Sequence, residues 1–174
     1  DAAEELCHVP PEARALTERF WPGPLTLLLP KKPVIPAVTN AGLDSVAVRM
    51  PDHPVALQLL KACNLPVAAP SANLSGKPSP TEARHVLHDL RGKIPFILDG
   101  GTCKVGLEST VLDLTGEPPA IVRPGGVTKE MLSAVLPGVR VAETAMRPLR
   151  TEETAVSPGM RHKHYAPKGE LLMV

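Results

Sequence analysis

A loop rich in hydroxyl groups follows the apolar run Pro66–Ala69, and its residue types suit a phosphate ligand. Between Pro70 and Ser79 it holds three serines, an asparagine, a lysine and Gly76. Hydroxyls and backbone N–H groups bind phosphate oxygens, and a glycine lets the backbone approach a ligand closely. The spacing is not that of a Walker A loop, G-x-x-x-x-G-K-[ST]. From composition alone, a polar surface turn explains the segment equally well.

Two arginines stand at the ends of expected strands, each with a proline within the next two residues. Arg49 follows S-V-A-V, and Arg123 follows A-I-V. A guanidinium group makes bidentate contacts with phosphates and carboxylates, and ligands of α/β sheets bind outside the carboxyl ends of strands. Ser109 or Thr110, which open another expected strand, could donate to the same anion. The pattern predicts one anion site built from distant segments, although a solvated charge or a capping hydroxyl is the default for each residue alone.

A basic segment, R-H-K-H-Y-A-P, occupies residues 161–167. His162 and His164 have no further ligands at suitable distances in the sequence, so a zinc site is only weakly indicated. A segment that folds over a polyanion is the better interpretation, and a disordered basic linker is the alternative. The sequence also contains neither the G-x-S-x-G of serine hydrolases nor the G-x-G-x-x-G of dinucleotide folds.

Apolar periodicity predicts the elements that must position these residues. Helices are expected over residues 2–20, with a break at Pro10-Pro11, and over 54–62, 81–90 and 128–135. Strands are expected over 25–29, 45–50, 66–69, 96–98, 109–114 and 120–122. Thr81 is the expected N-cap of its helix. Helices and strands mix along the whole length, which indicates an α/β or α+β fold.

Composition narrows the classes of function. The 174 residues are 43% hydrophobic but only 2% aromatic, which allows an aliphatic core and argues against a base-stacking surface for single-stranded nucleic acid. The formal net charge of +1 lacks the basic excess typical of duplex-binding proteins. Three separated cysteines indicate reduced thiols rather than a disulfide framework. No signal peptide and no membrane-length apolar run is present, so a cytoplasmic location without a membrane partner is expected.

Six motifs, in this order, resemble those of the threonylcarbamoyl-AMP synthase family, the YrdC-like proteins, in its longer form. They are R-F-W-P-G-P-L-T-L-L-L, S-V-A-V-R-M-P, A-P-S-A-N-L-S-G-K-P-S-P-T, L-E-S-T-V-L-D, I-V-R-P-G and S-P-G-M-R-H-K-H-Y-A-P. The resemblance implies an α/β fold, a twisted open mixed sheet flanked by helices, with a deep positively charged cavity and then an extended linker. It assigns residues 1–142 to the catalytic domain, 143–169 to the linker and 170–174 to the start of a C-terminal domain. It also implies that the opening strands of the domain, with a K-x-R motif, are missing, so this chain alone is expected to have little activity.

The same resemblance implies a nucleotidyltransferase that forms threonylcarbamoyl-AMP and pyrophosphate from L-threonine, bicarbonate and ATP, with Mg²⁺. The implied partner is a tRNA threonylcarbamoyl transferase, which passes the group to adenosine 37 of tRNA. Adenylation needs positioning and neutralisation of phosphate charge more than a covalent catalyst. No catalytic side chain and no protein-held metal are therefore predicted.

By motif position, the resemblance implies six ATP-binding residues: Ser45, Ser71, Asn73, Ser79, Arg123 and Tyr165. It implies a threonine site formed by Arg49, Ala69 and Ser109. Family members often carry threonine where this chain has Ala69, so that contact is expected through the backbone. Tyr165 belongs to the segment expected to close over the nucleotide and exclude water.

Three other functions stay open at this point. A double-stranded RNA or tRNA-binding module of the same fold would show salt-sensitive RNA binding without nucleotide turnover. A carbamoyltransferase-type domain would use carbamoyl phosphate in place of threonine, and the H-Y-A-P segment favours the synthase over it. A regulatory homologue would bind nucleotide without catalysis. Weak binding of tRNA or double-stranded RNA is also compatible with the synthase.

Overall fold

The computed structural model describes residues 2–146; the predictions for Tyr165, the basic segment 161–167 and residues 170–174 lie outside this range. The helices are α1 (Ala2–Leu6), α2 (Pro11–Phe20), α3 (Pro54–Cys63), α4 (Ala83–Leu90), α5 (Lys129–Ser133) and the short 3-10 helix η1 (Glu143–Ala145). The strands are β1 (Leu25–Pro30), β2 (Ser45–Val48), β3 (Thr110–Asp113), β4 (Ala120–Arg123) and β5 (Arg140–Val141).

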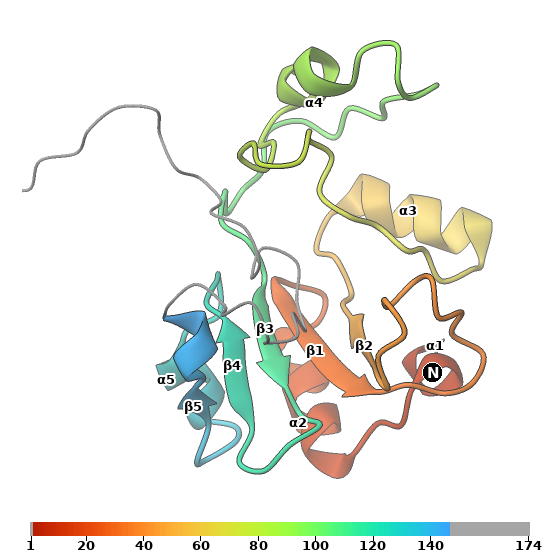
Figure 1. Ribbon diagram of the computed structural model, residues 1–174. Helices are drawn as coiled ribbons and strands as arrows, with labels where there is room; N and C mark the ends of the chain where they lie inside the picture. The colour runs from red at the N-terminus through yellow and green to blue at the C-terminus, as the bar shows by residue number, and fades with distance from the viewer. Residues whose placement is uncertain (1, 147–174) are drawn as a thin grey trace, which may run out of the picture.

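These strands form one open mixed sheet in the order β2-β1-β3-β4-β5 (Figure 1). β1 runs antiparallel to β2 and parallel to β3, β4 runs antiparallel to β3, and β5 runs parallel to β4. In this register Leu27 is the partner of Val48 on one side and of Leu112 on the other. The mixed sheet with its helices confirms the predicted α/β class.

An aliphatic core between α2 and the interior strand β1 holds the sheet together. Pro11 begins α2, a position that tolerates proline because its backbone nitrogen needs no helical partner. The buried face of α2 carries Ala13, Leu16 and Phe20 at helical spacing. All five residues from Leu25 to Leu29 are buried, as in strands that are covered on both faces. Truncating one buried leucine to alanine in such a core costs about 2–5 kcal/mol.

Two of the predicted strands are wrong. Residues 66–69 and 96–98 form no strand, and Val67 and Phe96 are 54% and 88% exposed. An extended segment becomes a strand only where a neighbour completes its backbone hydrogen bonds. Neither segment is hydrogen-bonded to the sheet formed by the described strands. Apolar composition identified residues suited to a strand but not whether a partner strand was present.

The start of α4 also differs from the prediction. Its N-cap is Glu82 rather than Thr81, and no side chain caps its first turn. The backbone N–H of Thr81 instead donates to His85 Nδ1 at 3.4 Å. Capping by hydroxyl does occur at α5, where the Thr128 hydroxyl accepts from the Met131 N–H at 3.3 Å.

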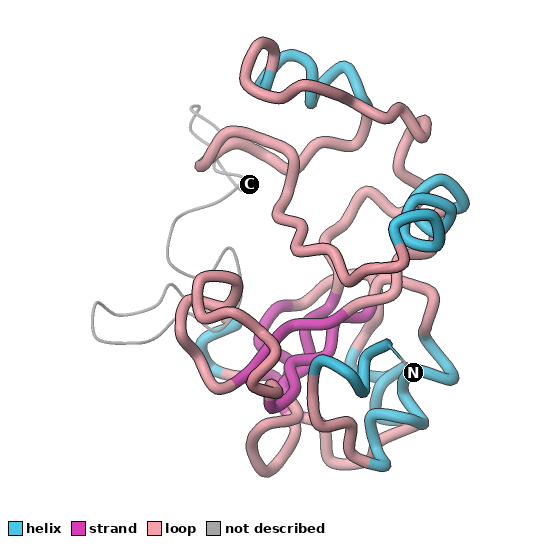
Figure 2. The backbone as a smooth tube through the Cα atoms, turned by 90° about the vertical axis from the view of Figure 1, so that its right-hand side faces the viewer, coloured by secondary structure: helices cyan, strands magenta, loops and turns pink. Residues whose placement is uncertain are grey.

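Between β2 and β3 the chain leaves the sheet and forms a lobe that carries α3 and α4 (Figures 1 and 2). The lobe extends from the end of the sheet at which β1 and β3 begin. The loop 70–79 lies between the two helices of this lobe. Within residues 2–146, no helix has the length and apolar character needed to cross a membrane.

Candidate functional site

Strand direction brings residues that are distant in sequence to one end of the sheet. β1 and β3 begin at this end, whereas the antiparallel strands β2 and β4 finish there. Arg49 directly follows β2, Arg123 is the last residue of β4, and Ser109 directly precedes β3. The structure therefore places these three residues at the same end of the sheet, next to the lobe.

Arg123 is held against Ser109 by three hydrogen bonds. Its Nε and Nη2 donate to the Ser109 carbonyl oxygen at 3.1 and 2.9 Å, and Nη2 also donates to Ser109 Oγ at 2.9 Å. The Ser109 hydroxyl lies 2.8 Å from the Thr26 hydroxyl, and both of these residues are buried. A guanidinium group held in a fixed orientation is well suited to recognise an anion.

Glu108 connects this cluster to the loop 70–79. The Ser79 hydroxyl donates to Glu108 Oε1 at 2.5 Å, and Glu108 Oε2 lies 3.5 Å from Arg123 Nη2. Ser79, Ser109 and Arg123, which carry predicted ligand-binding roles, therefore belong to one network. We call Thr26, Ser79, Glu108, Ser109 and Arg123 the arginine cluster.

The turn after β4 packs against the backbone of the arginine cluster. A Cβ atom on Gly125 would lie 2.3 Å from the Glu108 carbonyl oxygen and 2.4 Å from the Thr110 nitrogen, so only glycine fits here. The buried Thr110 hydroxyl donates to the Val127 carbonyl oxygen at 2.6 Å and accepts from the Val127 N–H at 3.0 Å. The segments E-S-T and R-P-G-G are therefore fixed against each other.

The loop 70–79 is braced from within and by α4. Asn73 Nδ2 donates to the carbonyl oxygens of Leu74 and Lys77 at 3.0 and 2.9 Å. The Lys77 ammonium pairs with Asp89 Oδ1 at 2.8 Å, and Asp89 Oδ2 accepts from the Leu74 N–H at 3.3 Å. The hydrogen bond from Lys77 lowers the pKa of the Asp89 carboxyl below its usual range. Asn73 thus shapes the loop, and its contact with ATP stays a prediction.

The other three predicted residues near this end are at the surface of the described structure: Arg49, Ala69 and Ser71. The Arg49 side chain makes no hydrogen bond or ion pair with any of residues 2–146. The backbone beside it is fixed, because the Met50 carbonyl oxygen accepts from the Gly23 N–H at 2.8 Å. The roles of Arg49, Ala69 and Ser71 in ligand binding stay predictions.

Ser45 lies away from the arginine cluster. It is at the start of β2, opposite Pro30, whereas Arg49 follows the end of that strand. At a rise of about 3.3 Å per residue, Ser45 and Arg49 are roughly 13 Å apart. The role of Ser45 in ATP binding stays a prediction.

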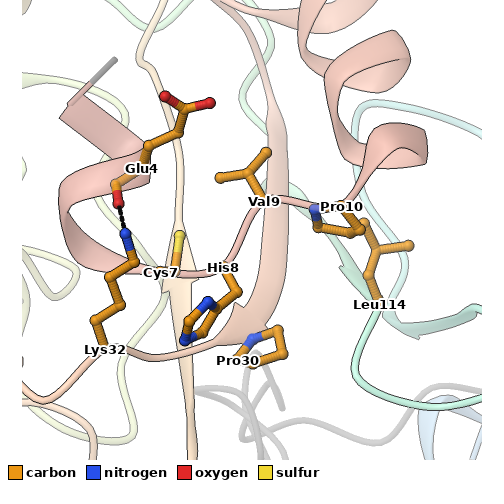
Figure 3. A pocket seen from close by; sticks show the side chains of 8 residues that line it. All are labelled: Glu4, Cys7, His8, Val9, Pro10, Pro30, Lys32 and Leu114. Atoms are coloured by element: carbon orange, nitrogen blue, oxygen red, sulfur yellow. Dashed lines mark hydrogen bonds between the residues drawn. The ribbon is translucent and has the colours of Figure 1, made fainter.

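A surface hollow of about 480 Å³ lies at the opposite end of the sheet, where its lining includes Pro30 and Leu114 (Figure 3). Lys32 Nζ donates to the Glu4 carbonyl oxygen beside it (Figure 3). Burial raises the pKa of the Cys7 thiol, and the positive charge of Lys32 opposes this shift only in part. A raised pKa disfavours the thiolate, which is the reactive form, so the hollow offers no activated thiol and is a weaker candidate site than the arginine cluster.

Sequence analysis missed Thr26 and Glu108 as members of the site. Thr26 is the hydroxyl-bearing residue inside the apolar run 25–29, and a buried hydroxyl requires a partner. The need of a buried hydroxyl for a hydrogen-bond partner could have identified Thr26 as a site residue from the sequence. Glu108 stands directly before Ser109 but has no comparable signal, because its partners come from other segments.

Fold and site define an α/β protein with an arginine cluster, of a composition suited to an anion, at one end of a mixed sheet. A family model described as Telomere recombination, Sua5/YciO/YrdC, matches residues 1–125. A second, described as Threonylcarbamoyl-AMP synthase, C-terminal domain, matches residues 127–174. The chain belongs to the Sua5/YciO/YrdC family. This confirms the family predicted from the motifs.

Curated relatives named threonylcarbamoyl-AMP synthase match most of the chain. The chain is 51% identical over 166 residues to the threonylcarbamoyl-AMP synthase of Pyrococcus abyssi (strain GE5 / Orsay), which covers 95% of the chain and 48% of that protein. It is 53% identical over 164 residues to the enzyme of the same name from Bacillus subtilis (strain 168), covering 93% and 46%. The chain thus spans about half the length of the curated relatives it matches.

Solved structures agree with the fold. The structure described as P. abyssi Sua5 complexed with L-threonine has a TM-score of 0.90 and 50% identity, covering 97% of this chain and 49% of that one. The structure of E. coli YciO has a TM-score of 0.62 and 25% identity, covering 71% and 61%.

Proposed function

We propose that the protein acts as an L-threonylcarbamoyladenylate synthase. The amine of L-threonine and bicarbonate form a carbamate with loss of water. A carbamate oxygen then attacks the α-phosphorus of ATP, the bond between the α-phosphorus and its bridging oxygen to the β-phosphate breaks, and pyrophosphate leaves. The product is threonylcarbamoyl-AMP.

The observation that carries this proposal is the network joining Ser79, Ser109 and Arg123 in a chain 51% and 53% identical to curated synthases. Adenylation requires phosphate oxygens to be held and their charge neutralised while the carbamate is positioned. A guanidinium fixed between strands, with two hydroxyl groups beside it, meets that requirement. L-threonine is bound in the P. abyssi relative, which supports a threonine subsite in this chain.

In this proposal the nucleotide contacts the arginine cluster and the loop 70–79. Arg123 and Ser79 bind phosphate oxygens, and Ser71 and Asn73 contribute from the same loop. Arg123 supplies the charge, because a guanidinium binds phosphate through a planar pair of donors. Closure over the nucleotide by Tyr165 is part of the same proposal.

Threonine, in turn, binds beside the nucleotide at the end of β2. The exposed Arg49 guanidinium is not committed to another carboxylate within residues 2–146, so it is available for the threonine carboxylate. The Ser109 hydroxyl and the backbone of Ala69 complete this subsite.

Magnesium enters this proposal with ATP. Within residues 2–146 no group of three or more His, Cys, Asp or Glu side chains could hold a metal ion. Mg²⁺ usually keeps several waters and binds through substrate phosphates with few protein ligands. In this proposal the ion is carried by the substrate and would neutralise phosphate charge when bound.

The product must be consumed by an enzyme that transfers its threonylcarbamoyl group to an acceptor and releases AMP. We propose that this enzyme is a tRNA threonylcarbamoyl transferase that modifies adenosine 37. A cytoplasmic location and weak binding of tRNA belong to the same proposal.

Pyrophosphate release tests the proposed function. The protein, produced as its gene encodes it, is incubated with ATP, Mg²⁺ and ¹⁴C-bicarbonate, with L-threonine or with D-threonine as the control. We expect release that requires L-threonine and bicarbonate, with one labelled carbon incorporated per pyrophosphate. Release that is independent of L-threonine would contradict the substrate assignment. Turnover of carbamoyl phosphate, or salt-sensitive RNA binding without turnover, would favour the two rival functions instead.

A further inference from the structure

We propose that Glu108 is a positioning residue of the nucleotide site. Its carboxylate holds the Ser79 hydroxyl and the Arg123 guanidinium at a fixed separation, so that loop and sheet present one phosphate site. This inference rests on the proposed function, because it takes Ser79 and Arg123 as ATP-binding residues. Glu108 acts through them rather than on the substrate.

The two oxygens of the Glu108 carboxylate have different partners. Oε1 accepts from the Ser79 hydroxyl at 2.5 Å, and Oε2 faces Arg123 Nη2 at 3.5 Å. The backbone of Glu108 is itself anchored, because its carbonyl oxygen accepts from the Gly126 N–H at 3.1 Å. The close packing of Gly125 against that carbonyl fixes it further. The side chain therefore extends from a rigid point on the sheet to a loop of the lobe.

The presence of the Glu108 carboxylate is better explained by positioning of its neighbours than by a contribution to the stability of the fold. The side chains of Arg123 and Glu108 are 22% and 33% exposed, and partly solvated ion pairs contribute little to the free energy of unfolding. A carboxylate next to a phosphate site also repels the ligand. Its presence there is favourable only where the orientation that it gives to the donors outweighs this repulsion.

The loop needs such a connection because its other anchor lies within the lobe. Lys77 and Leu74 are tied to Asp89 of α4, which fixes the loop to the lobe but not to the sheet. Ser79, the last residue of the same loop, donates to Glu108 beside the start of β3. Through this contact, Glu108 fixes the position of the loop 70–79 relative to Arg123.

Three substitutions separate length, charge and hydrogen bonding. Glu108→Ala removes both contacts. Glu108→Asp keeps the charge but is one methylene shorter, so it cannot reach both neighbours. Glu108→Gln keeps the length, and its amide can accept from Arg123 while donating to the Ser79 hydroxyl. Glu117→Gln is the matched control, since Glu117 is an exposed glutamate that follows the other end of β3.

Kinetics and calorimetric titration with ATP, on the protein as its gene encodes it, give the test. We expect Glu108→Ala and Glu108→Asp to raise the KM and Kd for ATP about tenfold, and Glu108→Gln to change them by less than about threefold. The KM for L-threonine should change by less than about twofold, because Ser109 stays fixed by Arg123 and Thr26. Melting temperatures close to that of the unsubstituted protein would exclude a general loss of structure.

A double-mutant cycle with Ser79→Ala gives a second readout. If Glu108 acts through Ser79, adding Glu108→Ala to Ser79→Ala should weaken ATP binding by clearly less than the product of the two single effects. Fully multiplicative effects would overturn the proposal.

Two further results would also overturn it. An unchanged Kd for ATP in Glu108→Ala would show that positioning is not needed. Equal losses in Glu108→Gln and Glu108→Ala, or a shift in the Mg²⁺ concentration for half-maximal rate, would instead indicate a role of the charge. If the unsubstituted protein binds ATP but does not require L-threonine for turnover, the proposed function fails, while the Kd values still decide the role of Glu108.

Discussion

Arg123 donates two hydrogen bonds to a single atom, the carbonyl oxygen of Ser109, and a third to the Ser109 hydroxyl. This contact joins the end of β4 to the start of β3. The position of the positive charge therefore depends on the pairing of two strands rather than on a freely rotating side chain. Substitutions that alter this pairing or its hydrogen bonds should therefore affect ligand binding.

Replacing Arg123 by lysine should strongly reduce activity. Lysine keeps the charge but cannot make the bidentate contact with the Ser109 carbonyl or present a planar pair of donors to phosphate. We expect kcat/KM for ATP to fall by about tenfold or more. Steady-state pyrophosphate release measures this, with Arg140→Lys, at an exposed position on β5, as the control. Equal activity of both variants would contradict the role of Arg123.

Adding a methyl group at Gly125 should disturb both stability and the site. Its Cβ would lie 2.3 Å from the Glu108 carbonyl oxygen, so the backbone that carries Glu108 and Ser109 must move. We expect Gly125→Ala to reduce the free energy of unfolding by about 1–3 kcal/mol and to lower activity. Urea unfolding measures the first effect. Gly116→Ala is the control, since nothing lies within 4 Å of its Cβ position, and a similar loss there would refute the packing argument.

Removing the Thr26 hydroxyl should affect threonine rather than ATP. Thr26→Val keeps the side-chain shape but loses the 2.8 Å hydrogen bond to the Ser109 hydroxyl. We expect a loss of about 1 kcal/mol in the free energy of unfolding and a rise of about threefold in the KM for L-threonine. Thr26→Ser retains the hydroxyl and should retain the KM. A change confined to the KM for ATP would speak against this assignment of Ser109.

The Lys77–Asp89 pair should make the loop 70–79 sensitive to acid. The hydrogen bond from Lys77 lowers the pKa of Asp89 in the folded protein, so its contribution to stability is present above the ordinary carboxyl pKa. It is lost as the pH falls through the lowered value. The stability difference between the unsubstituted protein and Asp89→Asn should therefore be present at neutral pH and vanish in strong acid. Urea unfolding over a pH series measures it, and a constant difference would contradict the pairing.

Local sequence patterns correctly predicted the elements whose apolar residues match the burial that the element has in the fold. The run Leu25–Leu29 forms a strand because apolar side chains suit a strand that is buried on both faces. The near-helical spacing of Ala13, Leu16 and Phe20 likewise predicted α2. The segments 66–69 and 96–98 have similar composition but no strand partner among residues 2–146, a property that no local pattern contains.

The same limit applies to the site. Arg123, Ser109 and Ser79 could be selected from residue type and motif, because arginine and serine suit phosphate. Glu108 could not, since its role comes from contacts with Ser79 and Arg123 that arise only in the folded chain. Ser45 shows a different limit, because its role was suggested by motif position alone, and the structure places it at the other end of β2 from Arg49, where that role stays a prediction.

A crystal structure with L-threonine and a non-hydrolysable ATP analogue tests the central claim most directly. We predict that Arg123 and Ser79 contact phosphate oxygens within hydrogen-bond distance, and that the threonine carboxylate lies against Arg49. A nucleotide bound instead in the hollow beside Cys7 and Lys32, with no ligand at the arginine cluster, would contradict the account.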